Sequence, residues 1–190
     1  MDEERAFFLS TPWCAKLLND PDFTPIATPA RKYKPGTTED ALYGHTLKTP
    51  DTFRAVTSIH RRPAPGTTLV QEVRQLISLG YAVNGYPHIA HGGIVGVILD
   101  EAMGTLLLVN KDLGQKRNEG QPFDRLVTAY LKVSYLMPVM TPQTVLVIAK
   151  LQKMEGKKLY IEGEVRNAEG SVLARAEALW LELKRPREKL

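Results

Sequence analysis

The sequence predicts an α+β fold in which an antiparallel sheet curves around one buried helix. Residues 93–110 (GIVGVILDEAMGTLLLVN) are apolar almost all round, and Asp100 and Glu101 are the only charges among them. A helix that is hydrophobic on every side is buried rather than laid on a surface. Several β-like runs follow it, and hairpin-length connections join the last three, which predicts antiparallel pairing. A concave sheet covers most of the circumference of a single helix, so we expect the strands to wrap around this segment.

The strands are expected on both sides of the helix. Before it, residues 53–61 contain several β-formers and residues 67–78 alternate between apolar and polar side chains. The stretch from 79 to 93, with Gly80 and Gly85 before the HGG motif, is expected to be a loop, and residues 111–122 are expected to be a polar connector. The later strands are expected at residues 123–136, 144–154, 159–166 and 171–184.

The chain is predicted to contain an N-terminal arm (1–50), a single domain (51–186) and a short basic tail (187–190). Prolines recur throughout the arm, so we expect a short helix within residues 2–19 that breaks or restarts at Pro12. From residue 20 to 36 we expect irregular, extended chain packed on the domain.

Composition narrows the function classes. With 190 residues, 43% hydrophobic and 24% charged, the chain can bury an ordinary globular core. A net charge of +4 is too weak to indicate a nucleic-acid partner. Cys14 is the only cysteine, which excludes an internal disulfide and favours a reducing, cytoplasmic location. The apolar run is shorter and more charged than a comfortable membrane span.

No cofactor or metal is expected. The four histidines are scattered without ligand spacing, and a single cysteine cannot form a thiolate cluster within one chain. Neither a P-loop nor a dinucleotide-binding fingerprint occurs in the sequence.

The motif AHGGIVGVILDEAMG carries the candidate chemistry. Gly92 and Gly93 open the helix, where backbone N–H groups lack partners within the helix. Because glycine has no side chain, a substrate oxygen can approach these N–H groups closely, and the helix dipole favours negative charge there. This arrangement suits an oxyanion hole, and it makes both glycines candidate site residues.

Asp100 lies two turns farther along the helix, about 10 Å from its start. It can act on the same carbonyl only if a second chain brings another helix alongside, which predicts a dimer. Burial should raise the pKa of Asp100 towards the range of a general base, although a nucleophilic role and a structural pairing with Lys or Arg stay open. Glu101 points about 100° away around the helix, where it either forms a salt bridge or solvent contact or lies near the substrate.

HGG, six apolar or small residues and then Asp resemble the motif of the hotdog-fold acyl-CoA thioesterases, of the phenylacetate-pathway and 4-hydroxybenzoyl-CoA thioesterase-like types. The resemblance covers roughly residues 67–184 and includes the downstream pattern VTAYLKVSYLMPV. It implies that Asp100 is the catalytic carboxylate and that the Gly92 N–H polarises the thioester carbonyl. It further implies that Thr128 positions water or substrate and that His91 orients the loop.

Two further residues are candidates for substrate contact. Asn84 lies one residue from a position where some relatives carry an amide side chain in the site. His88 either assists the carbonyl or hydrogen-bonds the loop. The resemblance also implies a homodimer or dimer of dimers with sites built from two chains, and an acyl-CoA or acyl-carrier thioester as substrate.

The leading hypothesis is therefore hydrolysis of an acyl thioester to a free acid and a thiol. A hotdog dehydratase or hydratase is the alternative among enzymes, because His91 or His88 offers a possible base. A non-catalytic acyl- or lipid-binding protein is the third hypothesis, in which the apolar helix only lines a ligand pocket.

Overall fold

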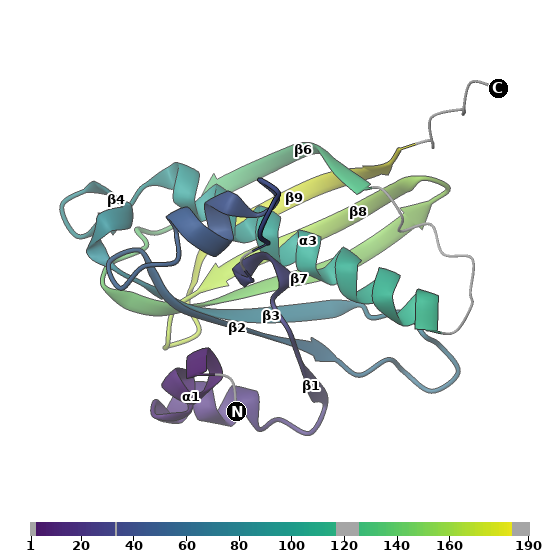
Figure 1. The fold of residues 1–190 in the computed structure, drawn as a ribbon, viewed down its shortest axis with the longest axis horizontal. Helices are drawn as coiled ribbons and strands as arrows, with labels where there is room; N and C mark the ends of the chain where they lie inside the picture. Colours follow the sequence, from purple (N-terminus) through teal and green to yellow (C-terminus); the bar gives the residue numbers. More distant parts are fainter. Residues whose placement is uncertain (1–2, 33, 117–125, 184–190) are drawn as a thin grey trace.

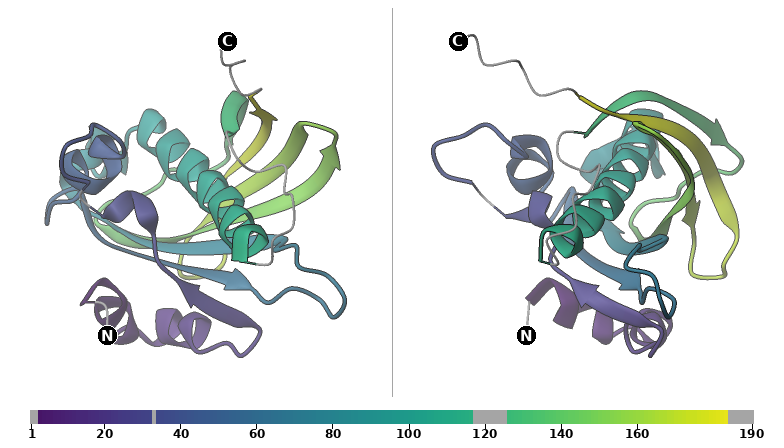
Figure 2. Two further views of the ribbon diagram at one scale, coloured as in Figure 1. Left: turned by 45° about the vertical axis from the view of Figure 1, so that its right-hand side comes forward. Right: turned by 90° about the vertical axis from the view of Figure 1, so that its right-hand side faces the viewer.

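A computed structural model describes residues 3–32, 34–116 and 126–183 of the chain. One antiparallel seven-stranded sheet curves around the long helix α3 (Gly92–Lys116), as Figures 1 and 2 show. In spatial order its strands are β1 (Phe23–Ile26), β2 (Phe53–Arg61), β3 (Glu72–Leu79), β7 (Gln143–Glu155), β8 (Lys158–Arg166), β9 (Val172–Glu182) and β6 (Leu126–Tyr135). The predicted wrapping of a sheet around one central helix is confirmed.

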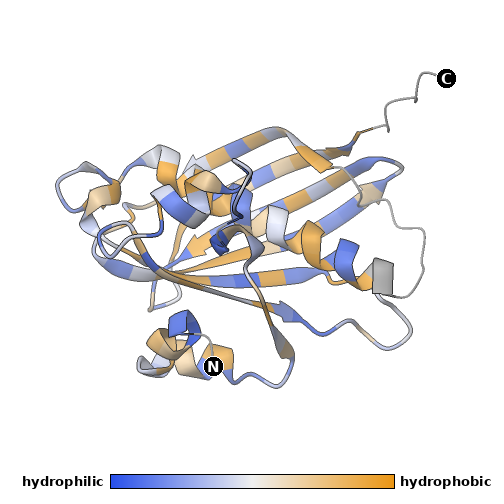
Figure 3. Ribbon diagram, in the orientation of Figure 1, coloured by the Kyte–Doolittle hydropathy of each residue, from blue (hydrophilic) through white to orange (hydrophobic). Residues whose placement is uncertain are grey.

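The main core lies between α3 and the concave face of the sheet. Buried α3 side chains include Ile98, Leu99, Met103 and Leu106, each with no exposed surface. Gly163 of β8 lets the helix approach, because a Cβ there would lie 2.8 Å from the Met103 methyl carbon and 2.9 Å from Leu99 Cδ2. Figure 3 shows hydrophilic and hydrophobic residues alternating along the strands, as expected when one face of a strand packs on a helix.

The first part of the arm packs on the opposite face of the same sheet, whereas Ala30, Tyr43 and Leu47 from its later part belong to the main core. Helices α1 (Glu3–Leu9) and α2 (Pro12–Leu18) lie on that opposite face, and their buried residues form a second apolar cluster. Pro12 is the first residue of α2, so the predicted break is confirmed. This cluster contains Phe8, Cys14, Leu18, Phe23, Ala55, Ile59, Leu76, Leu146 and Ile148.

Residues 23–26 differ from the prediction of irregular chain, because they form β1 and pair with β2. The edge of the sheet offers backbone partners that an extended segment can use. Pro25 is tolerated because β1 is an edge strand, where one N–H is not needed for pairing. The arm then passes through two short helical turns, η1 (Pro29–Arg31) and η2 (Leu42–Thr46).

Helix α3 is longer than the predicted 93–110, because residues expected in a polar connector continue it to Lys116. Asn110 holds this part in place: its side-chain oxygen accepts from the Val70 N–H at 2.8 Å, and its side-chain nitrogen donates to the Val70 carbonyl at 2.9 Å.

On length and composition alone, the Gly92–Leu113 segment could cross a bilayer, contrary to the expectation that it is too short. Half of that segment is buried inside the protein, which fits its place as the core helix.

The predicted loop before α3 contains more structure than expected. It holds a helical turn, η3 (Tyr81–Val83), and a small hairpin of β4 (Asn84–Tyr86) and β5 (Ile89–Ala90). The Ala90 N–H donates to the Val139 carbonyl at 2.9 Å, and the His91 N–H donates to the Val83 carbonyl at 2.8 Å. These bonds fix the chain as it enters the helix.

Candidate active site

The start of α3 presents one unpaired backbone donor. The His91 carbonyl accepts from Ile94 N at 2.9 Å and Val95 N at 3.2 Å, and the Gly93 N–H donates to Nδ1 of His91 at 2.9 Å. The Gly92 N–H forms no hydrogen bond with any residue that the structure describes. A free donor at the positive end of a long helix can hold an oxygen that becomes negatively charged. The Gly93 N–H is already engaged, so Gly92 is the donor available to a substrate.

Tyr135, at the end of β6, holds the same turn from the other side. Its hydroxyl donates to the Gly92 carbonyl at 2.9 Å. A Cβ on Gly92 would lie 3.2 Å from that hydroxyl oxygen and 3.3 Å from the ring carbon bearing it. The peptide between Gly92 and Gly93 is therefore held at its carbonyl by Tyr135 and at its N–H by His91. Sequence reasoning missed Tyr135, because only the fold brings residues 43 positions apart into contact.

Asp100 and Thr128 form the second group. The Thr128 hydroxyl donates to Oδ1 of Asp100 at 2.9 Å, which joins β6 to the middle of α3. A β-bulge lies directly after Thr128, and bulges of this kind commonly redirect side chains beside active sites. Burial raises the pKa of the Asp100 carboxyl, and the hydrogen bond from Thr128 opposes that rise. Within the described ranges, Asp100 takes part in no ion pair, which disfavours a purely structural pairing with Lys or Arg.

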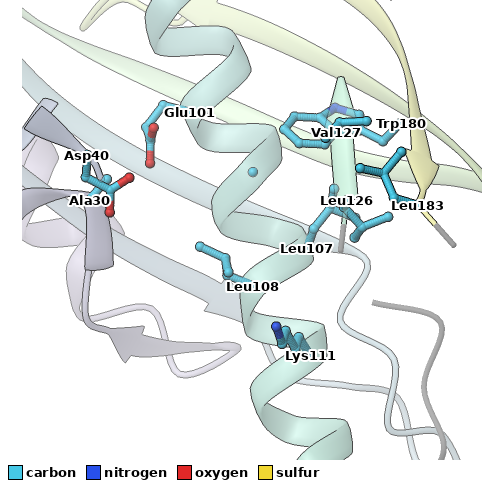
Figure 4. A pocket seen from close by; sticks show the side chains of 11 residues that line it. Ala30, Asp40, Glu101, Leu107, Leu108, Lys111, Leu126, Val127, Trp180 and Leu183 are labelled. Atoms are coloured by element: carbon cyan, nitrogen blue, oxygen red, sulfur yellow. The ribbon is translucent and has the colours of Figure 1, made fainter. Parts of the chain in front are cut away.

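Glu101, the neighbouring carboxylate, faces a different part of the molecule. It borders a cavity of about 440 Å³ that opens along α3, with Asp40 from the arm on the same side (Figure 4). Burial, reinforced by the charges of Asp40 and Asp100, raises the pKa of Glu101 to about 7. The expected salt bridge of Glu101 is absent from the part of the chain that the structure describes; Lys34 instead pairs with Asp40 at 2.6 Å.

Asn84 and His88 both belong to the β4–β5 hairpin and both bond to Thr141. The Thr141 hydroxyl donates to Oδ1 of Asn84 in a short hydrogen bond, and the Thr141 N–H donates to the His88 carbonyl at 2.9 Å. His88 is exposed and has a left-handed backbone (φ +61°), which suits the turn of the hairpin. In this structure the two residues anchor the hairpin, and their contact with a substrate stays a prediction.

The structure thus places the predicted catalytic residues in two groups rather than one. Eight residues of helix, a rise of about 12 Å, separate Gly92 from Asp100. The first group contains the helix start with Tyr135, and the second contains Asp100 and Thr128. Among the described residues, no cluster of three His, Cys, Asp or Glu could hold a metal ion.

The sequence of the chain matches a known protein family over the segment that contains most of these residues. Residues 88–174 match the family model of the thioesterase superfamily. Over these residues the chain is similar to the thioesterase superfamily. The matched segment includes His91, Gly92, Asp100, Thr128 and Tyr135, whereas Asn84 lies before it.

Curated relatives match part of this chain. Verlamelin biosynthesis protein B of Lecanicillium sp is 31% identical over 131 residues, which cover 59% of this chain and 57% of the relative. Acyl-coenzyme A thioesterase THEM4 of Mus musculus is 30% identical over 105 residues, covering 55% and 40%. The uncharacterized mitochondrial membrane protein FMP10 of Saccharomyces cerevisiae is 25% identical, covering 70% and 49%. The chain therefore spans about half the length of these relatives.

Solved structures support the fold assignment. Zebra fish thioesterase superfamily member 2 superposes with a TM-score of 0.57 at 15% identity, covering 82% of this chain and 93% of that one. A hypothetical thioesterase of Streptococcus pneumoniae, determined with coenzyme A, gives a TM-score of 0.51 at 16% identity, covering 61% and 84%. The chain has the hotdog fold that the sequence resemblance implies.

Proposed function

We propose that this chain hydrolyses acyl thioesters, with Asp100 as the general base and the Gly92 N–H as the oxyanion donor. The observation that carries the proposal is the Asp100 carboxylate, which is partly buried on an apolar helix and oriented by Thr128 rather than neutralised by a cation. The match of residues 88–174 to the thioesterase superfamily and the free donor at the helix start support it.

The geometry suits activation of water. Thr128 occupies Oδ1 of Asp100, which leaves Oδ2 to accept a hydrogen bond from a water molecule. As the water oxygen attacks the thioester carbonyl carbon, its proton passes to Asp100 and the carbonyl oxygen becomes an oxyanion held by Gly92. The carbon–sulfur bond then breaks, and the proton on Asp100 passes to the leaving thiolate. The products are a carboxylic acid and a thiol, and Asp100 returns to its ionised form.

A second copy of the chain would complete the site, since Asp100 and Gly92 lie too far apart on one helix to act on one carbonyl. Strand β6 is an edge of the sheet, and exposed apolar side chains lie along it and directly after it. Pairing of two copies along this edge would cover these residues and bring the helix start of one copy to Asp100 of the other. The exposed residues are Val127, Tyr130, Tyr135 and Leu136, each between 41% and 58% exposed.

Coenzyme A thioesters are the first substrates to test. THEM4 is named an acyl-coenzyme A thioesterase, and the pneumococcal structure contains coenzyme A.

The cytoplasmic location inferred from the single, buried Cys14 is likewise a proposal. Because FMP10 is named a mitochondrial membrane protein, imaging of the tagged full-length protein is the appropriate test; a mitochondrial signal would contradict this proposal.

The decisive experiment is a hydrolysis screen over aliphatic and aromatic acyl-CoAs with wild-type protein and Asp100→Asn. Asparagine keeps an oxygen for the Thr128 hydroxyl but cannot take a proton, so kcat should fall roughly 10²- to 10⁴-fold while the melting temperature stays close to the wild-type value. A variant with near-normal kcat would remove Asp100 from the mechanism.

Enoyl-CoA and 3-hydroxyacyl-CoA belong in the same screen, because their interconversion without hydrolysis would favour the hydratase alternative. Intact acyl-CoA bound without turnover would instead indicate a binding protein.

A further inference from the structure

The cavity beside Glu101 runs along α3, next to the candidate reactive pair. Its floor is α3 itself, from Glu101 past Gly104 to Leu108 (Figure 4). One wall is formed by β6 and β9 through Val127 and Trp180, and the arm forms the other. We call this cavity of about 440 Å³ the α3 groove; its volume is within the range typical of small-ligand pockets.

The α3 groove lies beside the residues that carry the proposed chemistry, although neither Asp100 nor Thr128 lines it. Asp100 and Gly104 are four residues apart and therefore lie on the same face of the helix. Val127, in the groove wall, directly precedes Thr128 in β6. From Gly104 the groove follows the helix to Lys111, a distance of about 10 Å. A chain attached to a carbonyl carbon at Asp100 can leave along this path.

Gly104 keeps the floor of the groove open. A Cβ at this position would meet only Trp180 Cη2, at the ordinary contact distance of 3.5 Å. Alanine would therefore fit, and it would favour the helix more than glycine does. Packing gives no reason for glycine here, whereas a ligand lying across the helix at this point does. Beyond Gly104 the groove is lined by Leu107, Leu108 and Leu126, with Lys111 at its far end.

The end nearest Asp100 carries two carboxyl groups. Glu101 and Asp40 face the groove from the helix and from the arm (Figure 4), and Asp40 also pairs with Lys34. A second carboxylate on a short acyl group would be brought against these two groups, whereas an uncharged chain would meet the apolar side chains between them and Lys111.

We propose that the α3 groove binds the acyl chain of the substrate, and that it selects uncharged chains of medium length, of the octanoyl to decanoyl class, with Gly104 as the specificity-determining residue. This inference rests on the proposed thioester hydrolysis and names its substrate class. Leucine at position 104 would occupy the groove one helical turn from Asp100 and stop a long chain while leaving room for an acetyl group.

The test compares kcat/KM for acetyl-, octanoyl- and decanoyl-CoA in wild type, Gly104→Ala, Gly104→Leu and Asp112→Leu. Asp112 is an exposed α3 residue outside the groove, so it controls for adding a leucine to the helix. The decanoyl-to-acetyl ratio should fall roughly tenfold or more in Gly104→Leu, less in Gly104→Ala and not in Asp112→Leu. An unchanged ratio in Gly104→Leu would overturn the assignment of the groove.

The charge preference is tested with butyryl-CoA and succinyl-CoA, whose acyl groups have the same number of carbons. Wild type should prefer butyryl-CoA roughly tenfold or more, and Glu101→Gln should narrow this preference. Equal rates for the two substrates in wild type would show that the groove does not exclude acidic chains.

A binding measurement separates failure of this inference from failure of the proposed function. Decyl-CoA and ethyl-CoA thioethers cannot be hydrolysed, and calorimetry gives their affinities even for an inactive protein. Tighter binding of the decyl compound by wild type, lost in Gly104→Leu, would support the groove whether or not any thioester is cleaved. Equal affinity of the two thioethers for wild type would refute it. Absence of hydrolysis with the groove intact would refute only the proposed reaction.

Discussion

Thr128 and Asp100 lie 28 residues apart in the sequence and share a hydrogen bond of 2.9 Å between the last edge strand and the central helix. The hydroxyl donates and the carboxylate accepts, so the contact stabilises the ionised form of Asp100. Burial acts in the opposite direction and raises the pKa of the same carboxyl. The carboxylate is thus made more basic by its surroundings while one of its oxygens is held in a fixed orientation.

Replacing Thr128 by valine should move the acidic limb of the pH–rate profile to higher pH. The substitution removes the contact that lowers the pKa of Asp100 and leaves the burial that raises it. Because the base must be ionised to act, the loss of kcat/KM should be greater at about pH 5 than at about pH 8, and about tenfold or more overall. Thr128→Ser keeps the hydroxyl and serves as the control, with a limb close to that of wild type. A valine variant with an unshifted limb would show that the hydrogen bond does not tune the base.

The Gly92 N–H can be removed without altering much else, because proline is well tolerated at the first position of a helix. Gly92→Pro lacks the N–H, whereas Gly92→Ala retains it and introduces a comparable crowding against Tyr135. If the N–H binds the oxyanion, kcat should be on the order of 10²-fold lower in the proline variant than in the alanine variant. Equal kcat values for the two variants would exclude an oxyanion role for this group.

Mixing of two inactive variants tests whether each site is built from two chains. In a mixed dimer of Asp100→Asn and Gly92→Pro, one site carries both substitutions and the other carries neither. Unfolding and refolding an equimolar mixture should therefore restore about one quarter of the wild-type activity. Activity that never exceeds that of the separate variants, in a mixture shown by mass spectrometry to contain mixed dimers, would place the site within one chain.

Glu101 should make the protein less stable as pH rises. Its pKa is raised from 4.5 to about 7 in the folded protein, so the folded state binds more protons than the unfolded state between these values. Its contribution to the free energy of unfolding is therefore most favourable below about pH 4.5 and is lost as pH rises to about 7. Glu101→Gln should be more stable than wild type by about 2 kcal/mol at about pH 8 and by little at about pH 5. Urea denaturation at the two pH values measures the difference, and a pH-independent difference would contradict the assignment.

The sequence by itself determined the central helix, the strands after it and the motif that opens it. An apolar run with only two charges favours a buried helix, and turn-like segments separate the strands that cover it. Asp100 could be singled out for the same reason, since a carboxylate in such a helix costs free energy without an evident packing role.

Only the tertiary structure decided which residues meet. β1 joins the sheet because the edge of β2 offers backbone partners, which no local pattern in residues 23–26 records. Tyr135 reaches Gly92, and Asp40 faces the groove beside Glu101, through contacts between segments far apart in the chain. Local propensity and hydrophobic periodicity act over a few residues and predict elements, whereas a site forms from side chains whose proximity depends on how the whole sheet curves around α3.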